Sequence, residues 1–181
     1  MNSIFVLFLI ILMLTGCANS SVNMNESGMI IGLSQGMGIT FNRSHDGSEL
    51  SILYEQARIN YDSNDIATNN KKDRYSTSFT LLTSKVGIPI RYIIRGDLKA
   101  PDKNQAKIIF LVGGKKINLP LFLDGSAFFS CFDQTLTEVE TLTEWEMELA
   151  ELKNEGATLI METIDIAIIN SNMPKECTER V

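Results

Sequence analysis

The chain has 181 residues, of which 44% are hydrophobic and 21% are charged, and these ordinary values exclude a disordered, collagen-like or coiled-coil protein. Its 16 Lys and Arg residues against 22 Asp and Glu residues give a formal net charge of −6. Nucleic-acid-binding proteins are usually basic, so no nucleic-acid partner is expected. With only three cysteines, the mature protein must rely on the hydrophobic core of one modest domain.

The N-terminal residues form an unbroken apolar run from Ile4 to Leu14, followed by Thr15-Gly16-Cys17. Its eleven residues are too few for a transmembrane helix, which needs about 20, and are typical of a signal peptide. The sequence LTGC that ends at Cys17 resembles the lipobox of bacterial lipoprotein precursors, in which Leu, two small residues and an invariant Cys follow one another. The resemblance implies that residues 1–16 are a lipoprotein signal peptide and that Cys17 is the lipidated N-terminal residue.

The resemblance also implies a location in the cell envelope. Two or more acyl chains on Cys17 would make a stable membrane anchor. Ala18 follows the cysteine in place of the Asp that retains such lipoproteins at the inner membrane, which implies the inner leaflet of the outer membrane, facing the periplasm. Residues 17–27 are then the lipidated Cys and a polar, flexible tether, and residues 28–181 are a single periplasmic β-rich domain.

Two cysteines, Cys131 and Cys177, remain once Cys17 is lipidated. Disulfides form and persist in the periplasm, so we expect these two thiols to be bonded to each other. A redox or metal site is the alternative, but the chain has no CxxC pair and its single histidine is His45. We therefore expect no metal and no cofactor.

The domain shows mainly the period-two alternation of half-buried strands. A Gly-Gly pair between the alternating halves of residues 107–123 indicates a hairpin, because both central residues of a type I′ turn need a positive φ. The predicted strands lie at residues 39–42, 50–55, 88–95, 107–112, 117–123 and 157–169.

One segment has helical spacing, from Thr141 to Glu155. Its apolar stripe contains Trp145, its opposite face is acidic, and Gly156 follows the last turn. Met147 lies at the margin of the acidic face. The predicted fold is mainly β: an antiparallel β-sandwich or small barrel with one amphipathic covering helix. The apolar stripe is Leu142, Trp145, Leu149 and Leu152, and the acidic face is Glu140, Glu144, Glu148, Glu151 and Glu155.

Charge is unevenly distributed along the chain. Residues 71–116 contain eleven Lys or Arg and three Asp or Glu, whereas residues 124–181 contain three and thirteen. One interpretation is that the acidic segment and the basic strands are neighbours that neutralise each other. The other is that one face steers a charged partner, which would be a peptidoglycan or lipid head group for the basic part or a basic protein segment for the acidic helix. The candidate partner-binding residues are then Glu144, Glu148, Glu151 and Glu155.

No catalytic residues are predicted. Ser44-His45-Asp46 has the residue types of a nucleophilic triad, but consecutive side chains cannot converge on one proton relay, so this stretch is expected to be a turn. The sequence predicts a non-enzymatic protein that binds the membrane through its lipid anchor and also binds an envelope protein partner. It would act as an accessory factor in secretion, pilus or conjugation assembly. The alternative is an exclusion or inhibitor lipoprotein that protects against phage, plasmid entry or an envelope-attacking enzyme.

Overall fold

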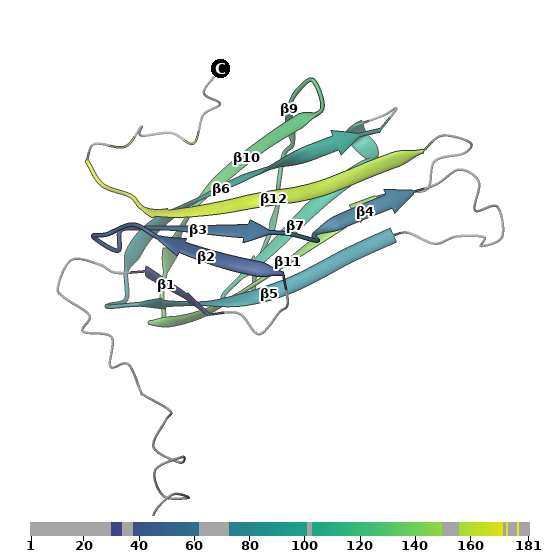
Figure 1. Ribbon diagram of the computed structural model, residues 1–181. Helices are drawn as coiled ribbons and strands as arrows, with labels where there is room; N and C mark the ends of the chain where they lie inside the picture. The colour runs from purple at the N-terminus through teal and green to yellow at the C-terminus, as the bar shows by residue number, and fades with distance from the viewer. Residues whose placement is uncertain are drawn as a thin grey trace, which may run out of the picture.

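The computed structural model of the chain describes residues 30–33, 38–61, 73–100, 103–149, 156–171, 173 and 177. These residues form twelve β-strands and one short 3-10 helix, η1 (Lys103–Gln105). The strands make two antiparallel sheets that lie face to face as two layers (Figure 1). The predicted signal peptide, Cys17 and tether lie outside the described residues.

The first sheet has five strands, and its central strand is the segment predicted to be the covering helix. In sheet order, the strands are β1 (Ile30–Leu33), β5 (Asp73–Thr83), β11 (Glu140–Leu149), β7 (Ala106–Val112) and β8 (Lys115–Asn118).

The second sheet has seven strands. One side of β12 pairs with β6, while its other side pairs first with β4 and then with β3. In sheet order, the strands are β2 (Ile39–Arg43), β3 (Glu49–Tyr54), β12 (Ala157–Ile168), β6 (Ile88–Lys99), β10 (Ala127–Leu136) and β9 (Phe122–Asp124), with β4 (Arg58–Tyr61) beside β12.

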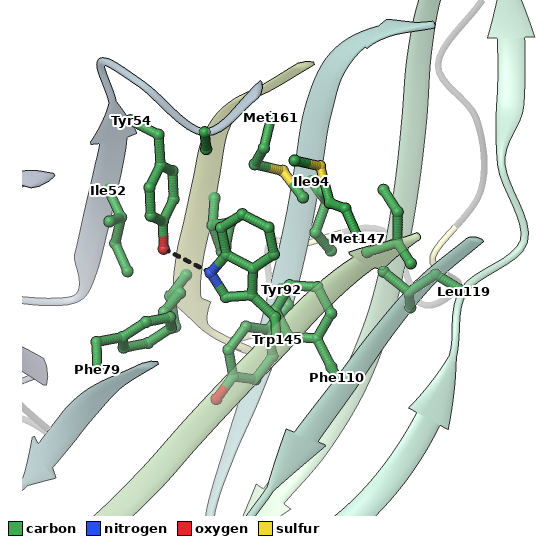
Figure 2. Close-up of a cluster of buried hydrophobic side chains, with 14 of the residues drawn as sticks. Ile52, Tyr54, Phe79, Tyr92, Ile94, Phe110, Leu119, Trp145, Met147 and Met161 are labelled. Atoms are coloured by element: carbon green, nitrogen blue, oxygen red, sulfur yellow. Dashed lines mark hydrogen bonds between the residues drawn. The ribbon is translucent and has the colours of Figure 1, made fainter. Parts of the chain in front are cut away.

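One hydrophobic core fills the space between the two sheets, because alternate residues of each strand face inward. Trp145 is 1% exposed and its indole N–H donates a hydrogen bond to the Tyr54 hydroxyl, 2.9 Å away on the opposite sheet (Figure 2). Tyr92 stacks on Phe132 within its own sheet and makes an edge contact with Phe110 of the other. The mainly β prediction is therefore confirmed, and the two layers share one core.

Several predicted strands and turns are confirmed. The strands predicted near residues 39–42, 50–55, 88–95 and 157–169 are β2, β3, β6 and β12. Gly113 and Gly114, with φ of 55° and 78°, form the expected turn between β7 and β8. The Ser44–Asp46 stretch lies in the turn between β2 and β3.

Gly96 of β6 lies beside a bulge in β12 and has no room for a side chain. Met161 pairs with Gly96 and Thr163 with Arg95, so Glu162 is the extra residue. A Cβ atom on Gly96 would lie 2.0 Å from the carbonyl oxygen of Ile160 and 2.7 Å from the Phe128 ring. Only glycine fits this position without a shift of the β12 backbone.

The predicted covering helix is wrong. Residues 140–149 form strand β11, and the described residues contain no α-helix. Residues 150–155, which include Glu151 and Glu155, lie outside the described residues. The stretch from Glu140 to Leu149 also alternates with period two, and β5 and β7 provide hydrogen-bonding partners on both of its sides. Met147, predicted at the margin of an acidic face, is fully buried.

Candidate partner-binding surface

The acidic residues of β11 form a column along the outer face of the five-stranded sheet. Because successive strand residues point to opposite faces, Thr143, Trp145 and Met147 are buried in the core. The residues between them point outward. From one end of the strand to the other, the outward residues are Glu140, Leu142, Glu144, Glu146 and Glu148.

One half of this column is neutralised by basic residues on the neighbouring strands. Arg74 of β5 lies 3.3 Å from a carboxylate oxygen of Glu146 and 3.6 Å from one of Glu148. Lys107 of β7 is the cross-strand partner of Glu148 on its other side. Glu148 is only 9% exposed. This half of β11 therefore supports the interpretation in which the acidic segment and the basic strands neutralise each other.

The other half of the column differs in both charge and polarity. Glu138, Glu140 and Glu144 are exposed and, among the residues that the structure describes, have no ion pair within 4.0 Å. They surround Leu142, which is 49% exposed. Lys116 lies on the same row as Glu144 but on the far side of Leu111, two strands away.

Exposed aliphatic side chains gather at this end of the sheet. Leu142 of β11 is paired with Thr80 of β5, which is paired with Leu33 of β1, so the three outward side chains form one row across the sheet. Leu33 is 53% exposed, and Val139, in the turn before β11, is 50% exposed. We call Leu33, Thr80, Val139 and Leu142 the Leu142 patch. Contiguous exposed apolar surface is typical of interaction sites.

A shallow hollow of about 600 Å³ lies over part of the Leu142 patch. One side is the turn at Gly113 and Gly114, and a Cβ placed on Gly114 would meet no atom within 4 Å. Because this turn consists of two glycines, it presents no side chain to a partner backbone on that side of the hollow. The lining residues are Thr80, Gly113, Gly114, Glu138, Val139, Glu140 and Leu142.

The structure separates the predicted partner-binding residues. Glu144 lies beside the Leu142 patch, whereas Glu148 belongs to the neutralised half of β11. Helical spacing predicts Leu142 on the buried apolar stripe, whereas in the structure it is exposed. The alternation of residues 140–149 is the signal that would have placed Leu142 outside.

Cys131 and Cys177 form a disulfide, with their Cα atoms 5.8 Å apart. Ser130, the residue before Cys131 in β10, is fully buried in the core. Because successive strand residues point to opposite faces, Cys131 lies on the outer face of the seven-stranded sheet. Two residues further along β10, Asp133 accepts two hydrogen bonds from the buried Arg91 guanidinium, at 2.7 and 2.8 Å. These bonds raise the pKa of Arg91. The disulfide thus ties Cys177 to the face opposite the Leu142 patch.

The Ser44-His45-Asp46 stretch has the hydrogen bonds of a turn and not those of a catalytic relay. The Asp46 carboxylate accepts bonds from the Ser48 backbone N–H at 3.0 Å and from the Ser44 hydroxyl at 2.7 Å. These bonds lower the pKa of Asp46 to about 2. No group of three His, Cys, Asp or Glu residues that could hold a metal ion occurs within the described ranges.

No protein-family model and no curated protein matches this chain. Among solved structures, the enzymatically active domain of tailspike protein 4 of bacteriophage CBA120 has a TM-score of 0.35 at 9% identity. That comparison covers 81% of this chain but spans only 20% of the tailspike chain. The CBM36-1 domain of a multidomain xylanase, from the hindgut metagenome of Trinervitermes trinervoides, has a TM-score of 0.33 at 11% identity and covers 79% of this chain and 98% of its own. Similarities this distant say nothing about function.

In the part of the chain that the structure describes, no helix has the length and apolar character needed to cross a membrane.

Proposed function

We propose that the protein is a lipoprotein anchored through Cys17 in the inner leaflet of the outer membrane. Its β-sandwich domain would be a non-enzymatic binding module that docks another envelope protein during the assembly of a secretion, pilus or conjugation apparatus. The LTGC sequence that ends at Cys17 supports the anchor and the location.

The Leu142 patch is the observation that carries the binding role. Leu33 and Leu142 are each about half exposed on a sheet whose other outward residues are mostly polar or paired in charge. Burying an exposed aliphatic side chain against a partner contributes about 1 to 2 kcal/mol, so a partner that covers this patch gains affinity from residues that do not contribute to the core. Glu146 and Glu148, in contrast, already have ion pairs with Arg74 within the fold.

Mass spectrometry of the protein extracted from membranes tests the anchor. The expected product begins at Cys17 and has the added mass of the acyl chains. A product that retains Met1, or that is cleaved elsewhere and lacks lipid, contradicts both the anchor and the outer-membrane location.

Photo-crosslinking in intact cells tests the binding surface. A benzoylphenylalanine at Leu142 should crosslink to one envelope protein. The same group at Thr40, exposed on β2 in the other sheet, should give no such product and is the matched control. Equal crosslinking at both positions, or none at Leu142, would reject the surface. A captured phage or plasmid entry component in place of an assembly protein would favour an exclusion lipoprotein.

A further inference from the structure

We infer that the partner docks on the Leu142 patch with an extended segment in which apolar side chains stand beside Lys or Arg. This inference rests on the proposed binding function and specifies the chemistry of the partner. It depends on the contrast between the two halves of β11, since only one half lacks counter-charges within the fold.

The carboxylates of this half are left for an external cation. Arg74 forms ion pairs with Glu146 and Glu148, and Lys107 is the cross-strand neighbour of Glu148, yet Glu138, Glu140 and Glu144 have no ion pair among the described residues. Two of these three, Glu138 and Glu140, line the hollow, and none of the lining residues is basic. These carboxylates beside the exposed aliphatic side chains of the Leu142 patch disfavour acidic segments and phosphate head groups and attract cationic ones.

The row from Leu33 to Leu142 has the length of a short extended segment. Leu33 and Leu142 lie two strands apart, which is about 10 Å, and a strand advances about 3.3 Å per residue. Four residues of an extended chain therefore reach from one leucine to the other. Their apolar side chains can cover Leu33 and Leu142 while flanking Lys or Arg side chains reach the three carboxylates.

The crosslink at Leu142 provides the test. Tandem mass spectrometry of the crosslinked peptide determines the sequence of the partner segment that contacts the Leu142 patch. We expect at least two Lys or Arg within about six residues of the crosslinked residue, and apolar residues between them. An acidic or uncharged segment overturns the inference but leaves the proposed binding function intact. Crosslinking to lipid alone, or to nothing, overturns both.

Charge removal beside the Leu142 patch gives a second readout. Replacing both carboxylates, Glu140→Gln and Glu144→Gln, should lower the crosslink yield at Leu142 about five- to tenfold, because each exposed pair with the partner contributes a modest free energy. The matched control is Glu162→Gln, an exposed carboxylate in the β12 bulge of the other sheet, which should leave the yield unchanged. Thermal melts that coincide with that of the unsubstituted protein establish that all variants are folded. An undiminished yield in the folded double variant rejects the cationic segment.

Discussion

Trp145 donates a buried side-chain hydrogen bond from one sheet to the other. Its ring makes an edge contact with Tyr54 at 5.1 Å between centroids, and Tyr75 packs on it at 5.4 Å. Helical and strand spacing both place Trp145 opposite the glutamates, so the sequence correctly predicts its burial. Its hydrogen-bond partner could not be predicted, because Tyr54 lies 91 residues away and no local pattern indicates that pairing.

Replacing the tyrosine hydroxyl tests the contribution of this bond. Tyr54→Phe should lower the free energy of unfolding by about 1 to 3 kcal/mol, because the indole N–H is left buried without an acceptor. Trp145 is the only tryptophan, so its fluorescence during urea unfolding measures the change directly. Tyr75→Phe is the control: Tyr75 is half-buried on the same ring, and its loss of a hydroxyl should cost less than about 0.5 kcal/mol. Equal stability of Tyr54→Phe and the unsubstituted protein would show that the bond contributes nothing.

Asp46 makes the turn between β2 and β3 sensitive to acid. The Ser48 backbone N–H and the Ser44 hydroxyl bind its ionised form and hold its pKa at about 2, below its ordinary value of 3.8. Because the pKa of Asp46 is lower in the folded chain than in the unfolded chain, its ionised carboxylate stabilises the fold above about pH 4. This contribution disappears as the pH falls toward 2. The melting temperature of Asp46→Asn should therefore lie below that of the unsubstituted protein at pH 6, and the two should converge near pH 2. A difference that does not change with pH would contradict this account.

Strand β11 shows why residue spacing alone does not decide between a helix and a strand. Helical and strand spacing agree on Trp145 but disagree on Leu142 and Met147. The glutamates also suit an exposed helix face. Two β-branched residues, Thr141 and Thr143, favour a strand, and neighbours β5 and β7 stabilise it in the fold. Those neighbours come from distant parts of the chain, so only the tertiary structure decides between the two periods.

The glycine turn is easier to predict because its signal is local, whereas the segment predicted as one strand at 117–123 contributes to β8 and β9, which belong to different sheets. Gly113-Gly114 specifies its own hairpin through positive φ. The Leu142 patch, in contrast, exists only because Leu33, Thr80 and Leu142 come into register across three strands. A sequence pattern can indicate that a residue alternates in a strand, but it does not indicate which strand lies beside it.

Charge reversal at two positions of β11 separates the neutralised half from the patch. Glu148→Lys places a third cation between Arg74 and Lys107 and should lower the free energy of unfolding by about 1 to 2 kcal/mol. Glu144→Lys changes an exposed residue without an ion pair in the described chain, and its stability should stay within about 0.5 kcal/mol. Urea unfolding of the two variants measures both effects. Equal losses of stability would mean that the two halves of β11 do not differ as the structure indicates.

For the molecule as a whole, the last strand connects most of the second sheet. β12 pairs with β3, β4 and β6, so strands from near both ends of the described chain meet along it. The Cys131–Cys177 disulfide closes a loop that contains β11 and β12, which are inner strands of the two sheets. This crosslink should therefore stabilise both layers.

Removing the disulfide tests whether it stabilises both layers. For a sequence separation of 46 residues, restriction of the unfolded chain corresponds to about 4 kcal/mol of stability. Cys131→Ser and Cys177→Ser should each lose about this much in urea unfolding, and the double variant should lose no more than either, because all three remove the same bond. Reductant should bring the unsubstituted protein to the same stability. A double variant that is much less stable than both single variants would show that the cysteines act separately. Because Cys131 lies on the sheet opposite Leu142, crosslinking at the Leu142 patch should persist in each variant below its melting temperature.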